Sequence, residues 1–251
     1  MPVEYRATIN PDVYIGQLHK SLTGHMVDLR NTLRSLEDGS FTERASAARQ
    51  NAVVQLQLTP LEGYDAGAAA VAACNRCFLD LVRAMIVYFD RMIAVKRCIR
   101  KKIKLTKALR SSEDQRAFIE TLLEQSYERV AHNSNLTNPT KVAEFPMLAD
   151  LPRKAALSYF SIRRCLEHHA GVASKALSLY TIKLTILADD QEITTLPYHA
   201  AEGTQISYRM DEASKVFVRG SRITLTEADA EGVFFTIQHV IAPEVRRALV
   251  Q

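Results

Sequence analysis

The chain has 251 residues, of which 47% are hydrophobic and 24% are charged, and its formal net charge is +4. This composition is typical of a globular protein that buries a core, so it excludes disorder as the main state. No apolar run reaches the roughly 18 residues of a membrane-spanning helix, and the first residues lack the pattern of a secretion signal. Four cysteines do not make a disulfide scaffold at this length, so we expect a cytoplasmic protein.

Apolar residues at three- and four-residue steps predict helices over the first three quarters of the chain. Asn10 and Pro11 mark the start of the first helix, because proline fits the first helical turn. Residues 38–40 break that helix, and a capping-box pattern then predicts a second helix over about 41–58.

A proline-free run predicts one long helix over about 66–108, aliphatic at first and strongly basic in its second half. Ser112 is a candidate N-terminal cap of the next amphipathic helix, which extends to about Val130. Residues 133–146 are polar and contain two prolines, so we expect a surface loop there.

Asp150 is expected to cap a helix over about 151–169 that Gly171 ends. Beyond about residue 177, apolar and polar residues alternate over 180–186, which predicts a strand. Residues 215–218 and 222–225 flank Gly220 and Ser221, and this pattern predicts a small hairpin.

Thr226 and Asp229 have the spacing that begins a last helix, and Pro243 is expected to start a short terminal turn. The fold class is therefore mainly α, with a bundle of about five helices and a small, partly β C-terminal extension. We expect residues 1–176 to form the helical bundle and residues 177–251 to form a small α+β extension packed on it.

Nine lysines and arginines and no acidic residue lie between positions 91 and 110. Such a stretch can neutralise a phosphate backbone, and the candidate nucleic-acid ligands in it are Arg97, Arg100, Lys101 and Lys104. The alternative is a solvated helix face that acids elsewhere in the chain balance, and the sequence leaves both interpretations open.

The chain contains no glycine-rich phosphate loop, no nucleophile elbow and no zinc-protease motif. Cys74 and Cys77 have metal-like spacing, but the second cysteine or histidine pair of a zinc site is missing nearby, and buried small side chains explain them better. We therefore expect neither a metal nor a cofactor.

Two arginines and two histidines crowd the C-terminal end of the predicted helix over 151–169. The helix dipole favours cations there, which is a purely structural explanation. The chemical explanation is that an imidazole moves protons while a guanidinium binds phosphate, which together suit RNA cleavage without a metal. The candidate catalytic residues are Arg163, Arg164, His168 and His169.

This stretch resembles the signature of the HEPN superfamily (higher eukaryotes and prokaryotes nucleotide-binding). The bacterial version reads roughly Arg-Asn-Cys-x-x-His-x-x-Gly, and Arg163, Cys165, His168 and Gly171 match it, while Arg164 stands where the family usually has Asn, Asp or His. The resemblance implies a bundle of four or five helices that forms homodimers with two signatures in one cleft.

Members with an intact signature are metal-independent ribonucleases of toxin–antitoxin, CRISPR and phage-defence systems, and others bind RNA or nucleotides without catalysis. The resemblance thus implies RNA, a second copy of the chain and an antitoxin or defence-complex protein as partners. It also implies that His168, with His169 as substitute, acts as acid or base while Arg163 and Arg164 bind the scissile phosphate.

Arg163 and His168 are five residues apart, about 140° around an ideal helix, so they do not share a face, whereas Arg164 and His168 do. Either the helix deforms near Gly171, or the working pair crosses a dimer, or Arg164 takes part. Three functions stay open: an endoribonuclease, a non-catalytic RNA-binding or assembly module, and a helical scaffold in which these residues only cap and pair.

Overall fold

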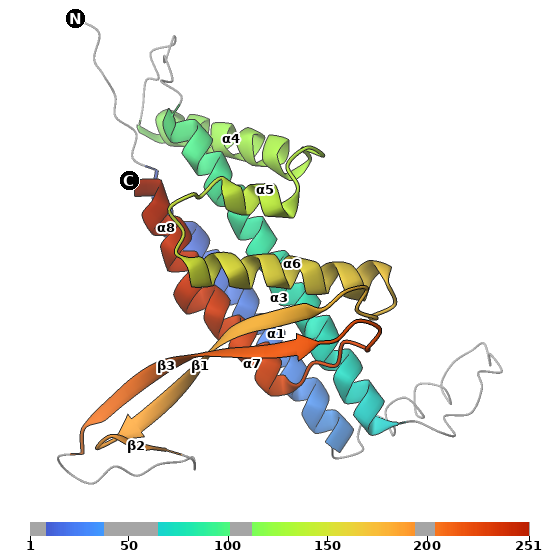
Figure 1. The fold of residues 1–251 in the computed structure, drawn as a ribbon. Coiled ribbons are helices and arrows are strands. Elements are labelled where there is room, and N and C mark those ends of the chain that lie inside the picture. Colours follow the sequence, from blue (N-terminus) through green and yellow to red (C-terminus); the bar gives the residue numbers. More distant parts are fainter. Residues whose placement is uncertain (1–8, 38–64, 101–111, 194–203, 251) are drawn as a thin grey trace, which may run out of the picture.

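The computed structural model describes residues 9–37, 65–100, 112–193 and 204–250 (Figure 1). The protein is mainly α, with a small antiparallel sheet near the C-terminus, as the sequence predicts. The helix predicted over 41–58 lies outside the described residues. The described helices are α1 (Asp12–Glu37), α3 (Ala66–Arg100), α4 (Ser112–Ala131), α5 (Asn138–Ala143), α6 (Asp150–His168), α7 (Glu227–Thr236), the π-helix η1 (Ile237–Ile241) and α8 (Ala242–Val250).

The helices α1 and α3 lie side by side along the length of the molecule, and the continuous run of α7, η1 and α8 lies beside them (Figure 1). The start predicted for the first helix is confirmed, because the Asn10 side chain accepts a hydrogen bond from the N–H of Asp12 at 3.0 Å. The helix α6 crosses this layer, and α4 and α5 pack at its upper end (Figure 1).

The surface loop predicted over 133–146 is wrong in part, because it contains the short helix α5. Pro139 lies in the first turn of α5, where a missing N–H costs no helical hydrogen bond. Lys141, Val142 and Phe145 are buried, so this polar-looking stretch packs against the body of the protein.

The predicted end of α6 is confirmed. Gly171 has a φ of +74°, a conformation that glycine adopts without strain. The N–H groups of His169 and Gly171 both donate to the carbonyl of Cys165, at 3.0 and 3.1 Å. The N-terminal cap is Ala149 rather than Asp150, which lies in the first turn, where the helix dipole favours an acid.

The sheet has three strands in the order β2-β1-β3, with β1 at Leu177–Ala188, β2 at Gln191–Glu192 and β3 at Ile206–Phe217. β1 confirms the strand predicted over 180–186. It pairs with β3 from Leu177↔Phe217 to Ala188↔Ile206, and the ribbon they form projects from the helices at the lower left of Figure 1.

The hairpin predicted around Gly220 is wrong. Residues 215–217 end β3 and pair with β1, while Arg222 forms only an isolated bridge with Val172. The physical reason is that a long neighbouring strand offers residues 215–217 more ladder hydrogen bonds than the four residues after Gly220 could.

The predicted start of the last helix is confirmed, because Thr226 and Asp229 form a reciprocal capping box. The helical run continues to Val250, so Pro243 does not start a separate turn. A proline in a helix lacks the N–H that would bond the preceding turn, and the π-helix η1, which ends at Ile241 two residues before Pro243, accommodates that loss.

The hydrophobic core joins the helices to the sheet and includes Phe78 of α3, Tyr159 of α6, Leu179 of β1 and Val233 of α7. Residues before and after position 176, the predicted boundary between the bundle and the extension, therefore contribute to this core. The close packing of α7 on β1 requires Gly232, since a Cβ there would lie 3.0 Å from the Cβ of Thr181. None of the helices described is both long and apolar enough to cross a membrane.

Candidate nucleic-acid interface at the end of α6

Backbone hydrogen bonds tie the C-terminal end of α6 to the loop between β3 and α7. The N–H of Ile223 donates to the carbonyl of Gly171 at 2.8 Å, and the N–H of Ala173 donates to Ser221 at 2.9 Å. The side chain of Asn75 on α3 bonds the carbonyl of Ile223 at 3.0 Å and the N–H of Leu225 at 3.2 Å. The end of the signature helix is thus held by two segments that are distant in the sequence.

Arg163 forms an ion pair with Glu167, one helical turn later, with Nε 2.9 Å from Oε2. Arg83 of α3 contacts the same carboxylate at 3.3 Å and also pairs with Asp80 at 3.0 Å. Burial alone would raise the pKa of Glu167, but the two guanidiniums outweigh it and hold that pKa below its ordinary value. Arg163 is therefore paired within the chain, and only 22% of its side chain is exposed.

Arg164 and His168 lie on a different face of α6 from Arg163 and Glu167. The helix is regular through His168, so no deformation between positions 163 and 168 brings Arg163 round to that histidine. Arg164, His168 and His169 are exposed, and none of the three has a side-chain hydrogen bond or ion pair to any described residue. Within one chain, the guanidinium that shares a face with His168 is that of Arg164.

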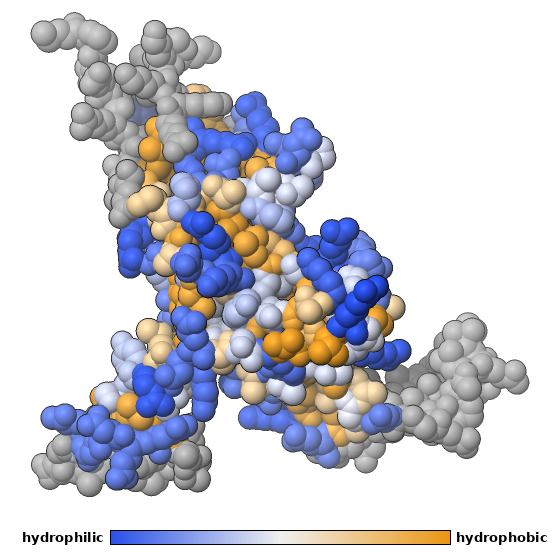
Figure 2. Space-filling view, viewed as in Figure 1, coloured by the Kyte–Doolittle hydropathy of each residue, from blue (hydrophilic) through white to orange (hydrophobic). Residues whose placement is uncertain are grey.

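Three further exposed cations lie on the segments that meet at this end, namely Lys175, Arg219 and Arg222. Arg222 is directly opposite Val172, which follows the signature, and the N–H of Gly220 donates to Ala173 at 2.8 Å. We call Arg164, His168, His169, Lys175, Arg219 and Arg222 the α6-end surface. Hydrophilic residues predominate at this end of the molecule, at the right of Figure 2, beside a smaller hydrophobic area.

The basic stretch of α3 is paired with acids where the structure describes it. Arg97 contacts Glu144 at 3.7 Å with 39% of its side chain exposed, and Lys96 pairs with the same carboxylate at 3.4 Å. Arg91 lies 3.5 Å from the centre of the Tyr127 ring and pairs with Glu124. The side chain of Arg100 and the whole of Lys101 and Lys104 fall outside the described residues, so the role predicted for this stretch stays a prediction.

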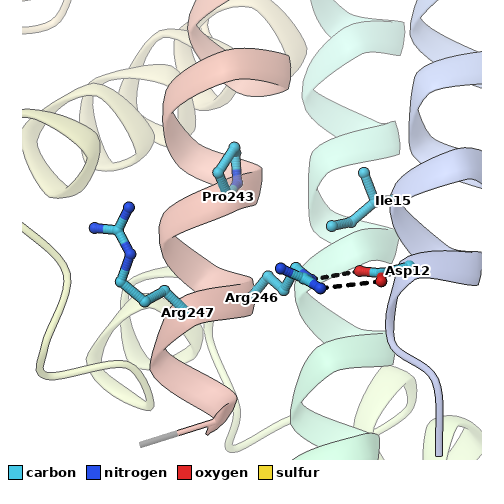
Figure 3. Close-up of a pocket in the computed structure, with 5 residues that line it drawn as sticks. All are labelled: Asp12, Ile15, Pro243, Arg246 and Arg247. Atoms are coloured by element: carbon cyan, nitrogen blue, oxygen red, sulfur yellow. Dashed lines mark hydrogen bonds and ion pairs between the residues drawn. The ribbon is translucent and has the colours of Figure 1, made fainter.

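A shallow pocket of 520 Å³ lies where the start of α1 meets α8 (Figure 3). Asp12, Ile15, Pro243, Arg246 and Arg247 line it. Arg246 pairs with Asp12 across the pocket, as the dashed lines in Figure 3 show, and Arg247 pairs with Glu244. Its charges are thus already matched within the chain, and it includes no residue of the α6-end surface.

Cys74 and Cys77 are buried in the core, as expected of small packed side chains. Burial raises the pKa of Cys77 to about 12, so the thiolate that binds metals is strongly disfavoured. In the part of the chain that the structure describes, no three His, Cys, Asp or Glu residues gather in a way that could hold a metal ion.

Comparisons with protein-family models, with curated proteins and with solved structures find no match to this chain. The HEPN resemblance therefore depends on Arg163, Cys165, His168 and Gly171 alone.

Proposed function

We propose that this is a HEPN-like protein that acts on RNA and binds the RNA backbone through the α6-end surface. The observation that carries the proposal is that this surface presents Arg164, Lys175, Arg219 and Arg222, all exposed and without an acidic partner among the described residues. Phosphate groups supply the negative charge that such a surface lacks, and arginine binds them in a fixed fork.

Two acids that share Arg83 are already paired within the chain. Asp80 pairs with Arg76 and Arg83, and Glu167 pairs with Arg83 and Arg163. These three arginines exceed the two acids by one positive charge, so this cluster has no net negative charge that would repel a phosphate backbone. In contrast, Arg91, Lys96 and Arg97 on α3 each have an acidic partner. Over the described residues, the α6-end surface is thus favoured over Arg91, Lys96 and Arg97 of α3.

Replacing Arg164, Arg219 and Arg222 together by Gln is expected to weaken binding of a fluorescently labelled single-stranded RNA by roughly 10-fold to 100-fold. Each lost phosphate contact should also lower the slope of log affinity against log salt by about 0.7. Fluorescence anisotropy between about 50 and 200 mM salt measures both quantities.

The matched control replaces Lys20, Arg34 and Arg129 by Gln. These cations are also exposed and form no ion pair with described residues, but they lie on α1 and α4. The control removes the same net charge, so it should leave the affinity within a factor of about two if binding is local. Equal losses in both triple variants, or no binding by the unchanged protein, would contradict the proposal.

Cleavage of the bound RNA is a second candidate function, and the placement of His168 favours it. Arg164 and His168 are one turn apart on the same face of α6, and both side chains are exposed. A guanidinium at a phosphate and an imidazole beside it can stabilise the phosphorane and move a proton of the ribose hydroxyl. Because Glu167 occupies Arg163, the role that the resemblance gives to Arg163 passes to Arg164 in this hypothesis.

Replacing His168 and His169 together by Ala should then slow cleavage by about 10²-fold to 10⁴-fold, the usual contribution of general acid–base catalysis. RNA affinity should change little, because the arginines remain. A gel assay of RNA fragments in the presence of a chelator measures the rate, with His132→Ala as the control, since His132 is exposed at the end of α4. If the unchanged protein binds RNA but does not cleave it, the catalytic function is contradicted and only non-catalytic RNA binding remains.

A further inference from the structure

The two long strands of the ribbon differ at their outer edges. The outer edge of β1 is bonded by helices, because Tyr159 donates to the carbonyl of Tyr180 at 2.8 Å and the N–H of Ile182 donates to Thr236 at 2.8 Å. Over the described residues, no hydrogen bond reaches the outer edge of β3 between Ile206 and Val216. A twelve-residue strand with a free edge is a template for pairing with another strand.

The register shows which groups of β3 point outward. Tyr180 and Ile182 direct their backbone groups away from β3, so their partners Ser214 and Glu212 direct theirs away from β1. Backbone groups alternate along a strand, so the outward-pointing residues of β3 are the even-numbered ones. Met210 is the third of the six residues in this free row.

The same strand exposes large apolar side chains, with 54% of Ile206, 70% of Tyr208 and 52% of Met210 accessible to solvent. All three lie on one face of the ribbon, next to Ile186 of β1, which pairs with Tyr208 and is 38% exposed. Apolar residues together at a free strand edge mark a surface that another protein covers.

We propose that β3 pairs with β3 of a second copy of this chain, antiparallel, across a two-fold axis at Met210. Residues whose backbone groups point outward then lie opposite each other. Met210 lies opposite the partner's Met210, and Tyr208 lies opposite the partner's Glu212. The two ribbons become one continuous antiparallel sheet.

Charge complementarity favours this register over those with an axis at position 209, 211 or 212. With the axis at Met210, Arg209 lies opposite the partner's Asp211, and Asp211 lies opposite the partner's Arg209. An axis at position 209 would set Arg209 against itself, and an axis at 211 or 212 would set Asp211 or Glu212 against itself. Like charges directly opposite each other destabilise a strand pair. Arg209 and Asp211 already contact each other at 2.7 Å within one chain, with about half of each side chain exposed.

This interface differs from the shared cleft that the HEPN resemblance implies. Met210 is seven residues from Phe217, roughly 23 Å along the strand, and the α6-end surface lies beyond Phe217. The two copies of that surface would therefore be more than about 40 Å apart, at opposite ends of the joined sheet. The inference depends on β3 alone, so it does not require the proposed RNA binding.

The test is the molar mass of the full chain by size-exclusion chromatography with light scattering, in the absence of RNA. We expect the unchanged protein to have twice the chain mass of 28.1 kDa. Arg209→Asp and Asp211→Arg should each raise the dimer dissociation constant at least about tenfold, because each replaces two attractive pairs by two repulsive ones. The double variant R209D/D211R restores both attractive pairs and should be a dimer again.

Mixing the two single variants provides a sharper result, since only the mixed pair has both attractive contacts. We expect a heterodimer from two proteins that are monomers when separate, which also shows that each variant is folded. Arg129→Asp, on α4 far from the ribbon, is the control for a change of two charge units and should remain a dimer. A monomeric unchanged protein, or a dimer that the single variants leave intact, would overturn the proposal.

Discussion

Lys141→Met is expected to destabilise the protein by about 3–5 kcal/mol, the usual cost of leaving one buried charge without its partner. Lys141 of α5 contacts both carboxylate oxygens of Asp90 on α3, at 2.6 and 2.9 Å. Only 7% of the Lys141 side chain and 5% of the Asp90 side chain are exposed. Methionine fills a similar volume, so the loss reports mainly the unpaired carboxylate.

The pH dependence of this loss has a definite sign. Burial raises the pKa of Asp90 above its ordinary value, and the Lys141 ammonium offsets part of that rise. Without the ammonium the pKa in the folded state rises further, so the folded protein binds a proton more readily than the unfolded chain. The variant should therefore lose most stability at neutral pH and recover part of it as the pH falls through the raised pKa.

Urea unfolding followed by circular dichroism measures the free energy of unfolding at each pH. In the double variant Asp90→Leu with Lys141→Met no buried charge remains, so most of the loss should be recovered. Lys154→Met, an exposed position on α6, should change stability by less than about 0.5 kcal/mol. A single Lys141→Met variant as stable as the unchanged protein would contradict the buried pair.

Elements with short-range signals could be predicted from the sequence. Thr226 and Asp229 act within one helical turn, and Gly171 ends α6 through its own backbone angle, so neither depends on distant residues. The α5 helix could not be predicted in the same way. Its stability comes from the burial of Val142 and from the pair between Lys141 and Asp90, a residue on another helix.

The prediction of a hairpin around Gly220 failed because pairing partners are a property of the whole fold. Residues 215–217 have strand character, which the sequence shows, but their partners begin at Leu177, some forty residues earlier. Alternation shows that a strand exists and does not identify its neighbour.

The candidate site was predictable only in part. The contact between Arg163 and Glu167 has the four-residue spacing of a helical ion pair, so the sequence contained that signal. The sequence contained no such signal for Arg219 and Arg222, because only the backbone hydrogen bonds of Gly220, Ser221 and Ile223 bring them to the end of α6. Loops that fold back on a helix terminus have no periodicity to reveal them.

Tyr159→Ala is expected to destabilise the protein by about 3–5 kcal/mol, because it removes a fully buried ring that joins three elements. The ring of Tyr159 on α6 packs edge-on against Phe78 of α3 with centroids 6.0 Å apart, and its hydroxyl donates to the carbonyl of Tyr180 on β1. Alanine leaves a cavity that the surrounding helices and strand cannot fill without moving.

Tyr159→Phe separates the two contributions of this side chain. It keeps the ring and leaves the carbonyl of Tyr180 without its donor, so we expect a smaller loss of about 1–2 kcal/mol. In thermal unfolding, the midpoint should fall by on the order of 10 °C for alanine and a few degrees for phenylalanine. α6 presents Arg164 and His168 only while it stays packed on β1. At temperatures at which the Tyr159→Phe variant is folded, it should therefore bind RNA as tightly as the unchanged protein. Equal stability of the two variants would mean that the ring contributes no packing energy, contrary to its burial in the core.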